Sequence, residues 1–284
     1  MAKVIMIQGT SSGVGKSILS TALCRIFKKE GFNVAPFKAQ NLSTNYHALK
    51  NGDKMARSQV LAAYACDIEP DTDMNPVLIM PSEKGSEFIL QGKPISSFAD
   101  IEYEKLREHA FNKILESFNR LAKKYDIIVI EGAGSPVEMN LIKSDIVNMA
   151  LAQAVNSPII LVSDITRGGV FASLYGTINL LTKEQRELVK GIVVNKFIGD
   201  CKSFEDGKHI IEKLCNVPVL GVVPHTTIEL EDEDNLSDFS SPHKTKILSK
   251  NEMAAEFERI ATHFKKHLDM NNIFNILNGG KKDE

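Results

Sequence analysis

Tryptophan is absent from this 284-residue chain, and neither sign of charge dominates, since the formal net charge is only −2. A chain this close to neutrality lacks the strongly basic surface that binds nucleic-acid backbones, so we expect no nucleic-acid partner. No apolar run is long enough to span a membrane, and the N-terminus opens on a strand-like run without signal-peptide features. These absences predict a globular protein with no membrane partner.

Cysteine is scarce as well, and Cys24, Cys66, Cys201 and Cys215 show neither paired nor metal-binding spacing. Cys24 and Cys66 lie in segments with an apolar or alanine-rich helical pattern, so we interpret them as buried thiols. The spacing argues against a disulfide scaffold and against a cysteine-based metal site. This usage of cysteine suits a reducing compartment and predicts a cytoplasmic location.

One stretch near the N-terminus organises the rest of the chain. Residues 4–7 form a short, β-branched apolar run, typical of a buried strand, and a turn of small residues follows. Gly15, Lys16 and Ser17 then open a segment whose apolar residues recur every three or four positions, as in a helix. This order predicts a phosphate-binding loop, with Lys16 as a catalytic residue at the β/γ-phosphates of ATP and the Ser17 hydroxyl at Mg²⁺.

The loop departs from the common form at its first glycine. That glycine is expected five residues before Gly15, but Thr10 stands there and Gly9 precedes it. A chance Gly-Lys-Ser at a helix start is the alternative, and the flanking strand and helix argue against it. The residues predicted to bind the nucleotide are Thr10, Ser11, Ser12, Gly13, Val14, Gly15, Lys16 and Ser17.

Apolar runs and helical patterns alternate along the remaining chain, which predicts a doubly wound, mostly parallel α/β sheet of the P-loop NTPase type. Further strands are expected at 33–37, 125–130, 158–162, 191–195 and 217–223. Helices are expected at 54–66, 100–124, 144–155, 170–188, 203–215 and 251–268, with small strands within 86–95. Residues 1–236 are expected to form one domain, and residues 237–284 a polar linker and a helix that packs on it.

Charged residues follow several of these strands, where doubly wound sheets bind their ligands. Glu131 ends an apolar strand, and we interpret it as a catalytic, Mg²⁺-binding carboxylate, with a helix cap as the alternative. Lys38 opens a polar loop at 38–45 after the second strand. It either meets the transferred phosphoryl group, as a catalytic residue, or is a plain surface lysine.

Other strand ends carry side chains suited to recognition. Asn195 offers a donor and an acceptor that match an adenine edge, and a turn asparagine is an equal alternative. Asp164 and Arg167 follow the fourth strand, where they form either a structural pair or a site for a carboxylate. Gln40 and Asn41 stand near the second strand, where a third, acidic Mg²⁺ ligand is expected but missing.

Six motifs, in this order and over about residues 3–236, resemble the cobyric acid synthase family. They are Gln8-Gly9-Thr10-Ser11-Ser12, Pro36-Phe37-Lys38-Ala39-Gln40-Asn41, Asp73-Met74-Asn75-Pro76-Val77-Leu78, Glu131-Gly132-Ala133-Gly134-Ser135-Pro136, Asp164-Ile165-Thr166-Arg167-Gly168-Gly169-Val170-Phe171 and Asn195-Lys196-Phe197. Dethiobiotin synthetase shares only the loop and the Glu-Gly-Ala-Gly part. Partition-type ATPases differ too, because they carry an extra lysine where Ser11 and Ser12 stand.

The resemblance implies an ATP-dependent enzyme that amidates peripheral carboxylates of adenosylcobyrinic acid a,c-diamide, through an acyl phosphate and ammonia, in cobalamin biosynthesis. It implies that Thr10 to Ser17 bind ATP, that Glu131 binds Mg²⁺ and that Asn195 reads the adenine. Around the phosphates and the corrinoid it places Lys38, Gln40, Asn41, Asn75, Asp164 and Arg167. The alternatives are a dethiobiotin synthetase-like enzyme that activates a carboxylate or carbamate, and a nucleotide-switched partition-type ATPase.

Members of this family normally continue into a glutamine amidotransferase domain with a cysteine nucleophile. No cysteine here has that context, and few residues follow Pro224, so we expect the synthetase half without that domain. The ammonia donor is then a separate glutaminase domain or subunit, or free ammonia. The sequence gives no oligomeric state, and a homodimer is compatible with it.

Overall fold

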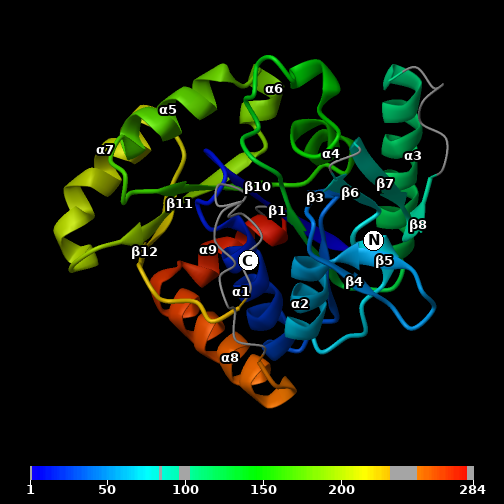
Figure 1. The fold of residues 1–284 in the computed structure, drawn as a ribbon. Helices are drawn as coiled ribbons and strands as arrows, with labels where there is room; N and C mark the ends of the chain where they lie inside the picture. The colour runs from blue at the N-terminus through cyan, green and yellow to red at the C-terminus, as the bar shows by residue number, and fades with distance from the viewer. Residues whose placement is uncertain (1, 83–84, 96–102, 231–247, 280–284) are drawn as a thin grey trace.

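A six-stranded parallel sheet forms the centre of the protein in the computed structural model, which describes residues 2–82, 85–95, 103–230 and 248–279 (Figure 1). The strand order is β12-β11-β10-β1-β9-β2. The strands are β1 (Lys3–Gly9), β2 (Val34–Phe37), β9 (Ile127–Glu131), β10 (Ile159–Asp164), β11 (Val189–Phe197) and β12 (Val219–Pro224). The predicted doubly wound α/β fold is confirmed.

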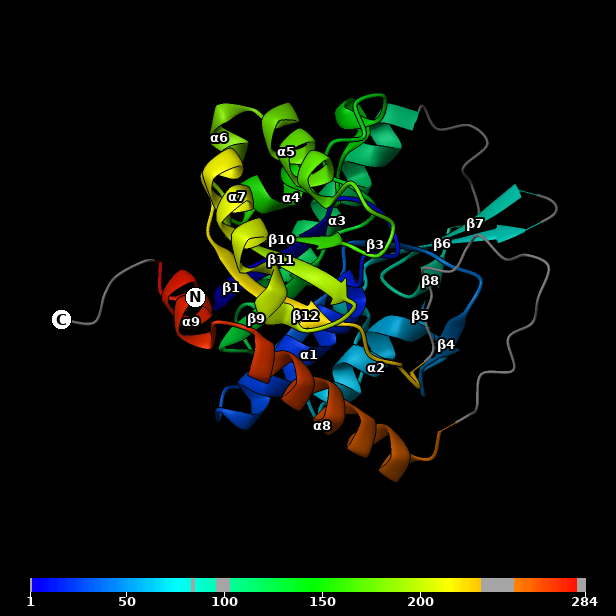
Figure 2. The ribbon, with the colours of Figure 1, turned by 90° about the vertical axis from the view of Figure 1, so that its left-hand side faces the viewer.

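Helices cover both faces of this sheet (Figure 2). One face packs against α1 (Lys16–Lys29), α8 (Lys250–His267) and α9 (Met270–Leu277), and the other against α3 (Tyr103–Leu121), α4 (Met149–Ala154), α5 (Val170–Leu180) and α7 (Glu205–Cys215). Along β1, Ile5 and Ile7 enter the first core and Met6 the second, and all three are fully buried. Burial on both faces explains why the strands are continuously apolar.

A second, smaller sheet lies beside β2. Its strands are β3 (Gln40–Leu42), β6 (Val77–Ser82), β7 (Gly85–Leu90) and β8 (Lys93–Pro94), in the order β3-β6-β7-β8. The prediction of a polar loop at 38–45 was therefore partly wrong, because β3 pairs in parallel with β6. In the chain, β3 is followed by a hairpin of β4 (Tyr46–Ala48) and β5 (Lys54–Ala56). Because β5 takes up residues 54–56, the helix expected at 54–66 begins later, as α2 (Arg57–Ala65).

Two other predicted helices also differ from the expected ranges. The helix at 170–188 is divided into α5 and α6 (Lys183–Arg186), because the Thr182 hydroxyl accepts the Gln185 backbone N–H and starts a new helix. The helix at 144–155 is α4 alone, preceded by an irregular segment. Among the described residues, no helix is long and apolar enough to cross a membrane.

The C-terminal helix expected at 251–268 is α8, which lies along α1 (Figure 2). Phe257, Ile260 and Phe264 share one apolar core with α1. Arg25 of α1 also pairs with Glu258 at 2.6 Å. The short α9 was not predicted, and the polar linker expected from residue 237 lies largely outside the described residues.

Candidate active site

The phosphate-binding loop runs from the end of β1 into the first turn of α1. Gly13 and Gly15 have φ of +72° and +100°, in the left-handed region that favours glycine. A Cβ at Gly15 would also collide with the side-chain nitrogen of Asn195, and one at Gly9 would lie 2.6 Å from a Val14 methyl group. In α1, which is described throughout, no side chain caps the N-terminus and no acid occupies the first turn. Nothing on the helix start therefore competes with a bound phosphate.

Lys16 joins two loops across the site. Its buried ammonium donates to the carbonyl oxygen of Ser11 at 3.0 Å and to that of Gly134 at 3.1 Å. Thr10, in place of the usual glycine, shares a 2.9 Å hydrogen bond with the Ser163 hydroxyl on β10. The loop is thus tied to β10 on one side and to the segment after β9 on the other.

Glu131 ends β9 at the centre of a buried polar cluster. Its Oε1 accepts hydrogen bonds from Ser17 Oγ at 2.6 Å and from Lys38 Nζ at 2.7 Å, and its Oε2 accepts one from Gln59 Nε2 at 3.5 Å. Lys38 is buried, so it is not the surface lysine considered as an alternative. Glu131 is bonded to side chains in the described structure, which also disfavours its alternative role as a helix cap.

The same cluster fits a Mg²⁺ ion. The Ser17 hydroxyl and the Glu131 carboxylate are adjacent hard oxygen groups of the kind that Mg²⁺ prefers. Gln59 Oε1 beside them is buried and has no hydrogen-bond partner in the described structure, which suits a metal-bound water. The described residues contain no group of three or more His, Cys, Asp and Glu that could hold a metal. Mg²⁺ needs few protein ligands when phosphate oxygens and water supply the rest.

The end of β11 supports the phosphate-binding loop from the β10 side. Asn195 Nδ2 donates to the Val14 carbonyl at 2.8 Å, and Lys196 Nζ donates to the Gly13 carbonyl at 2.5 Å. Lys196 itself has a positive φ of +60°. Asn195 therefore has a structural role in the loop, and its predicted part in adenine recognition stays a prediction.

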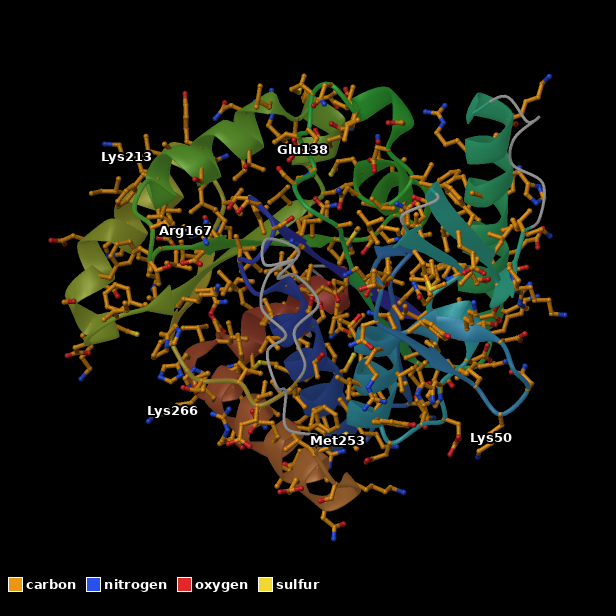
Figure 3. The ribbon with its side chains drawn as sticks, in the orientation of Figure 1. Lys50, Glu138, Arg167, Lys213, Met253 and Lys266 are labelled. Atoms are coloured by element: carbon orange, nitrogen blue, oxygen red, sulfur yellow. The ribbon has the colours of Figure 1, made fainter. Side chains whose placement is uncertain are left out.

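Asp164 and Arg167 are not paired with each other in the described structure. Asp164 pairs with Lys196 at 3.0 Å and accepts hydrogen bonds from Thr166. Burial alone would raise the pKa of Asp164, but Thr166 and the Lys196 ammonium hold it below its ordinary value. Arg167 is exposed on the segment between β10 and α5 (Figure 3). The roles of both residues in corrinoid binding stay predictions.

Asn75 is a junction between the two sheets. Its Nδ2 donates to the Lys38 carbonyl at 3.1 Å and to Asn41 Oδ1 at 2.9 Å, while its Oδ1 accepts the Ala56 backbone N–H at 3.0 Å. Asn75 is fully enclosed, so it positions Lys38 and Asn41. Gln40 and Asn41 line the cavity described next.

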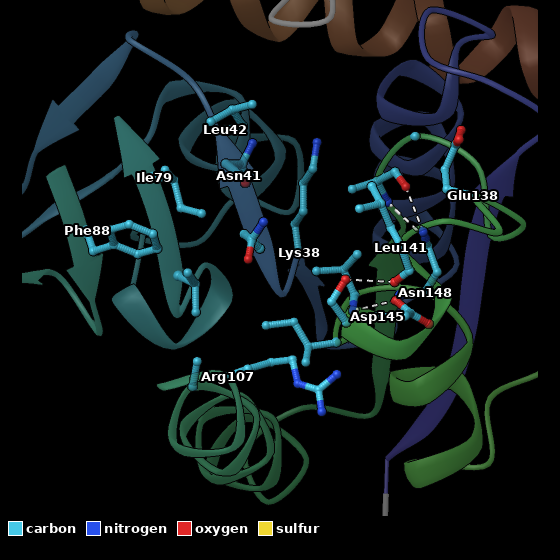
Figure 4. A pocket seen from close by; sticks show the side chains of 18 of the residues that line it. Lys38, Asn41, Leu42, Ile79, Phe88, Arg107, Glu138, Leu141, Asp145 and Asn148 are labelled. Atoms are coloured by element: carbon cyan, nitrogen blue, oxygen red, sulfur yellow. Dashed lines mark hydrogen bonds between the residues drawn. The ribbon is translucent and has the colours of Figure 1, made fainter. Parts of the chain in front are cut away.

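A cavity of about 450 Å³ opens beside the phosphate-binding loop (Figure 4). Leu42, Ile79 and Phe88 form a wall from the second sheet, and residues 133–148 contribute to the facing wall. Ser12 of the loop and Lys38 also line it, whereas Asp164 and Arg167 do not. The phosphate-binding loop therefore lies next to a mostly apolar cavity. Small-molecule substrate sites are usually cavities of this mostly apolar kind.

The facing wall is shaped by Asn148. Its Nδ2 donates to the Ala133 carbonyl at 2.7 Å, and its Oδ1 accepts the Ala133 N–H at 3.0 Å. A Cβ at Gly132 would lie 2.5 Å from Asn148 Oδ1. The Asp145 carboxylate accepts the Ala150 backbone N–H at 2.9 Å and so caps the first turn of α4. This cap accounts for the start of α4 at Met149 rather than at the expected residue 144.

Sequence reasoning missed Gln59, Arg107 and Asn148. All lie in segments predicted as helix, where a polar residue usually reads as part of the solvated face. Gln59 gave one signal, since it stands among alanines and apolar residues in a helix that the fold buries. For Arg107 and Asn148 only the tertiary structure shows the cavity that they line.

The fold and the loop together define a P-loop nucleotide-binding α/β protein. Residues 5–236 match the family model described as CbiA, the CobQ/CobB/MinD/ParA nucleotide binding domain. The chain belongs to this family. The resemblance to cobyric acid synthases, drawn from the motifs, is confirmed by the relatives that follow.

Cobyric acid synthase of Lachnoclostridium phytofermentans is 48% identical to this chain over 243 residues, which are 84% of this chain and 47% of that protein. The protein of the same name from Clostridium botulinum strain Loch Maree is 48% identical over 241 residues, 84% and 49% of the two chains. The chain thus spans about half the length of the curated relatives it matches. Among solved structures, the receptor FtsY of Elizabethkingia anophelis with GDP is 18% identical, with a TM-score of 0.46, over 90% of this chain and 63% of that one. A likeness of that size supports no statement about function.

Proposed function

We propose that this chain uses ATP to amidate peripheral carboxylates of a corrinoid, adenosylcobyrinic acid a,c-diamide, in the formation of cobyric acid during cobalamin biosynthesis. One observation carries the proposal: the phosphate-binding loop and the cavity meet at Ser12 and Lys38. A phosphoryl donor and a carboxylate acceptor can therefore be held side by side. The curated relatives, named cobyric acid synthase, supply the substrate class.

The chemistry needs two steps, because a free carboxylate is a poor electrophile toward ammonia. In the first, a carboxylate oxygen attacks the γ-phosphorus of ATP, ADP leaves, and an acyl phosphate forms. In the second, ammonia attacks the acyl carbon, the bond to the phosphate oxygen breaks with its electron pair, and the nitrogen loses a proton. Amide, ADP and inorganic phosphate are the products.

The protein mainly positions the reactants and neutralises charge. Lys16 would exchange its carbonyl acceptors for the β/γ-phosphate oxygens, and Lys38 lines the cavity. Ser17 and Glu131 are the residues that would hold Mg²⁺. The ion, when bound, supplies positive charge to the phosphate oxygens.

We propose that ammonia reaches the site from a separate glutaminase domain or subunit, or from solution. Cys24, Cys66 and Cys215 are buried, and Cys201 is half-buried. Burial raises the pKa of Cys24, Cys201 and Cys215, whereas a thiolate nucleophile needs a lowered one. Ammonium, rather than glutamine alone, should therefore support amidation by this chain.

The test combines the purified chain with ATP, Mg²⁺, ammonium and a corrinoid polycarboxylate, and follows ADP together with corrinoid amides by mass spectrometry. Lys16→Ala should abolish both products, because it removes the charge that faces the phosphates. Lys29→Ala, at the far end of α1 and paired with Glu258, is the matched control and should retain turnover. ATP hydrolysis without any corrinoid amide, or undiminished amidation by Lys16→Ala, would contradict the proposal.

A further inference from the structure

Different side chains line the two ends of the cavity. Ser12 and Lys38 line the end at the phosphate-binding loop, and Arg107 of α3 lines it away from that loop. Figure 4 shows the Lys38 and Arg107 side chains reaching into the space between the two walls. A ligand that spans the cavity therefore meets the Arg107 guanidinium at one end and, at the other, the Lys38 ammonium that is paired with Glu131.

The Arg107 guanidinium forms no hydrogen bond or ion pair with any residue that the structure describes. Two acids line the same cavity, but Asp145 accepts backbone N–H groups and Glu138 is exposed. Arg120 on the same helix differs, because it makes a two-pronged pair with Asp73 at 2.5 and 2.8 Å. The planar fork of Arg107 is thus presented to the cavity, and its geometry matches a carboxylate.

The apolar wall narrows the class of ligand. Leu42, Ile79 and Phe88 offer a broad hydrocarbon surface, which a polyphosphate or a small dicarboxylate would leave uncovered. Leu141 and Ile142 at the cavity are exposed, at 55% and 38%. A flat, largely apolar body that bears several carboxylates matches both the apolar wall and the Arg107 guanidinium.

We propose that this cavity seats one edge of the corrinoid macrocycle, and that Arg107 binds a peripheral carboxylate other than the one that reacts beside Lys38. The inference rests on the proposed function and adds to it the location of the substrate and the residue that orients it. The macrocycle is larger than the cavity, so its remainder lies against the exposed Leu141 and Ile142. Which carboxylate reaches the phosphoryl donor is then set by the one that Arg107 holds.

The test measures corrinoid binding directly, by equilibrium dialysis in the presence of a non-hydrolysable ATP analogue. Arg107→Ala should raise the Kd of a corrinoid polycarboxylate about 10- to 100-fold, as expected for loss of a charge-assisted hydrogen bond. Arg107→Ala should not change the Kd of a corrinoid whose peripheral carboxyl groups are all converted to amides. The Kd of the ATP analogue should not change, since Arg107 lies away from the loop.

Lys105→Ala is the matched control, because it removes the same charge from an exposed position on the same helix that does not line the cavity. Equal weakening by Arg107→Ala and Lys105→Ala would show a general electrostatic effect and overturn the inference. So would an Arg107→Ala variant that binds the polycarboxylate like the unchanged chain. If the unchanged chain neither binds nor amidates any corrinoid, the proposed function fails and the inference with it.

Discussion

Replacing Lys38 by methionine removes one positive charge from the cluster around Glu131 and keeps a side chain of similar length. The Lys38 and Glu131 side chains are only 8% and 3% exposed, so solvent screens their interaction weakly. Glu131 keeps two donors in the variant, the Ser17 hydroxyl and the Gln59 amide. The substitution therefore isolates the charge of Lys38 from the rest of the cluster.

The expected cost follows from the geometry of the pair. At the observed separation of 2.7 Å and an effective dielectric constant of about 20, the Coulomb attraction is roughly 6 kcal/mol, and desolvation offsets part of it. Breaking one partner of a buried pair costs about 3–5 kcal/mol. Because Ser17 and Gln59 still donate, we expect about 3 kcal/mol, which lowers Tm by roughly 6–12 °C in a chain of this size.

Mg²⁺ should behave differently in the two single variants. In Lys38→Met, an ion bound at Glu131 replaces the missing positive charge, so Mg²⁺ should stabilise this variant more than the unchanged chain. In Glu131→Gln the proposed Mg²⁺ ligand itself is changed, so adding Mg²⁺ should not raise the Tm of this variant. The double variant, with a neutral pair, should be less destabilised than the two single changes added together.

The assay is thermal unfolding of each variant, with and without Mg²⁺ and ATP. Lys265→Met is the control, since it breaks an ion pair with Glu30 whose side chains are 53% and 39% exposed and should cost less than about 1 kcal/mol. A Lys38→Met variant that melts with the unchanged chain would refute the argument about burial. Equal Mg²⁺ stabilisation of Lys38→Met and the unchanged chain would refute the argument about the metal.

Two further predictions concern the loop and the C-terminal helix. Gly15→Ala should weaken ATP binding about tenfold or more, because its Cβ meets Asn195 and its φ is strained, as titration with ATP would show. Stability should fall as pH is lowered from about 6.5 toward 5, because burial lowers the pKa of His263 and the unfolded chain then binds the proton more readily. His263→Gln should flatten that part of a Tm-against-pH series, and an unchanged slope would assign it to other groups.

The strands of the central sheet could be predicted because each is a continuous apolar run. Such a run can be recognised from neighbouring residues alone, without knowledge of tertiary contacts. The phosphate-binding loop could be predicted for the same reason, since residues 9–17 carry its turn, lysine and hydroxyl in consecutive positions. The second sheet could not. Its strand β3 has only three residues and depends on β6, to which Asn75 ties it through hydrogen bonds that no local pattern encodes.

Within the cluster around Glu131, Lys38 and Glu131 could each be predicted as strand-end residues, but their contact could not. Its formation depends on the pairing of β2 with β9, in which Phe37 lies opposite Ile130. The next residues after this pair are Lys38, which follows β2, and Glu131, which ends β9, so this register places them together. The strand order that makes β2 and β9 neighbours is a property of the whole sheet. The alternation of strands and helices along the sequence does not specify that order.

The segment after β9 links the nucleotide site to the cavity at Gly134. The Gly134 carbonyl accepts a hydrogen bond from Lys16, and Gly134 also lines the cavity. β1 and β9 are direct neighbours, with Ile7 paired to Glu131, so the loops that follow them start from the same edge at a fixed separation. In the proposed reaction the phosphoryl donor lies on the first loop and the carboxylate beside the second. Their alignment is then set by backbone pairing within the sheet, which accounts for a site whose work is mainly positioning.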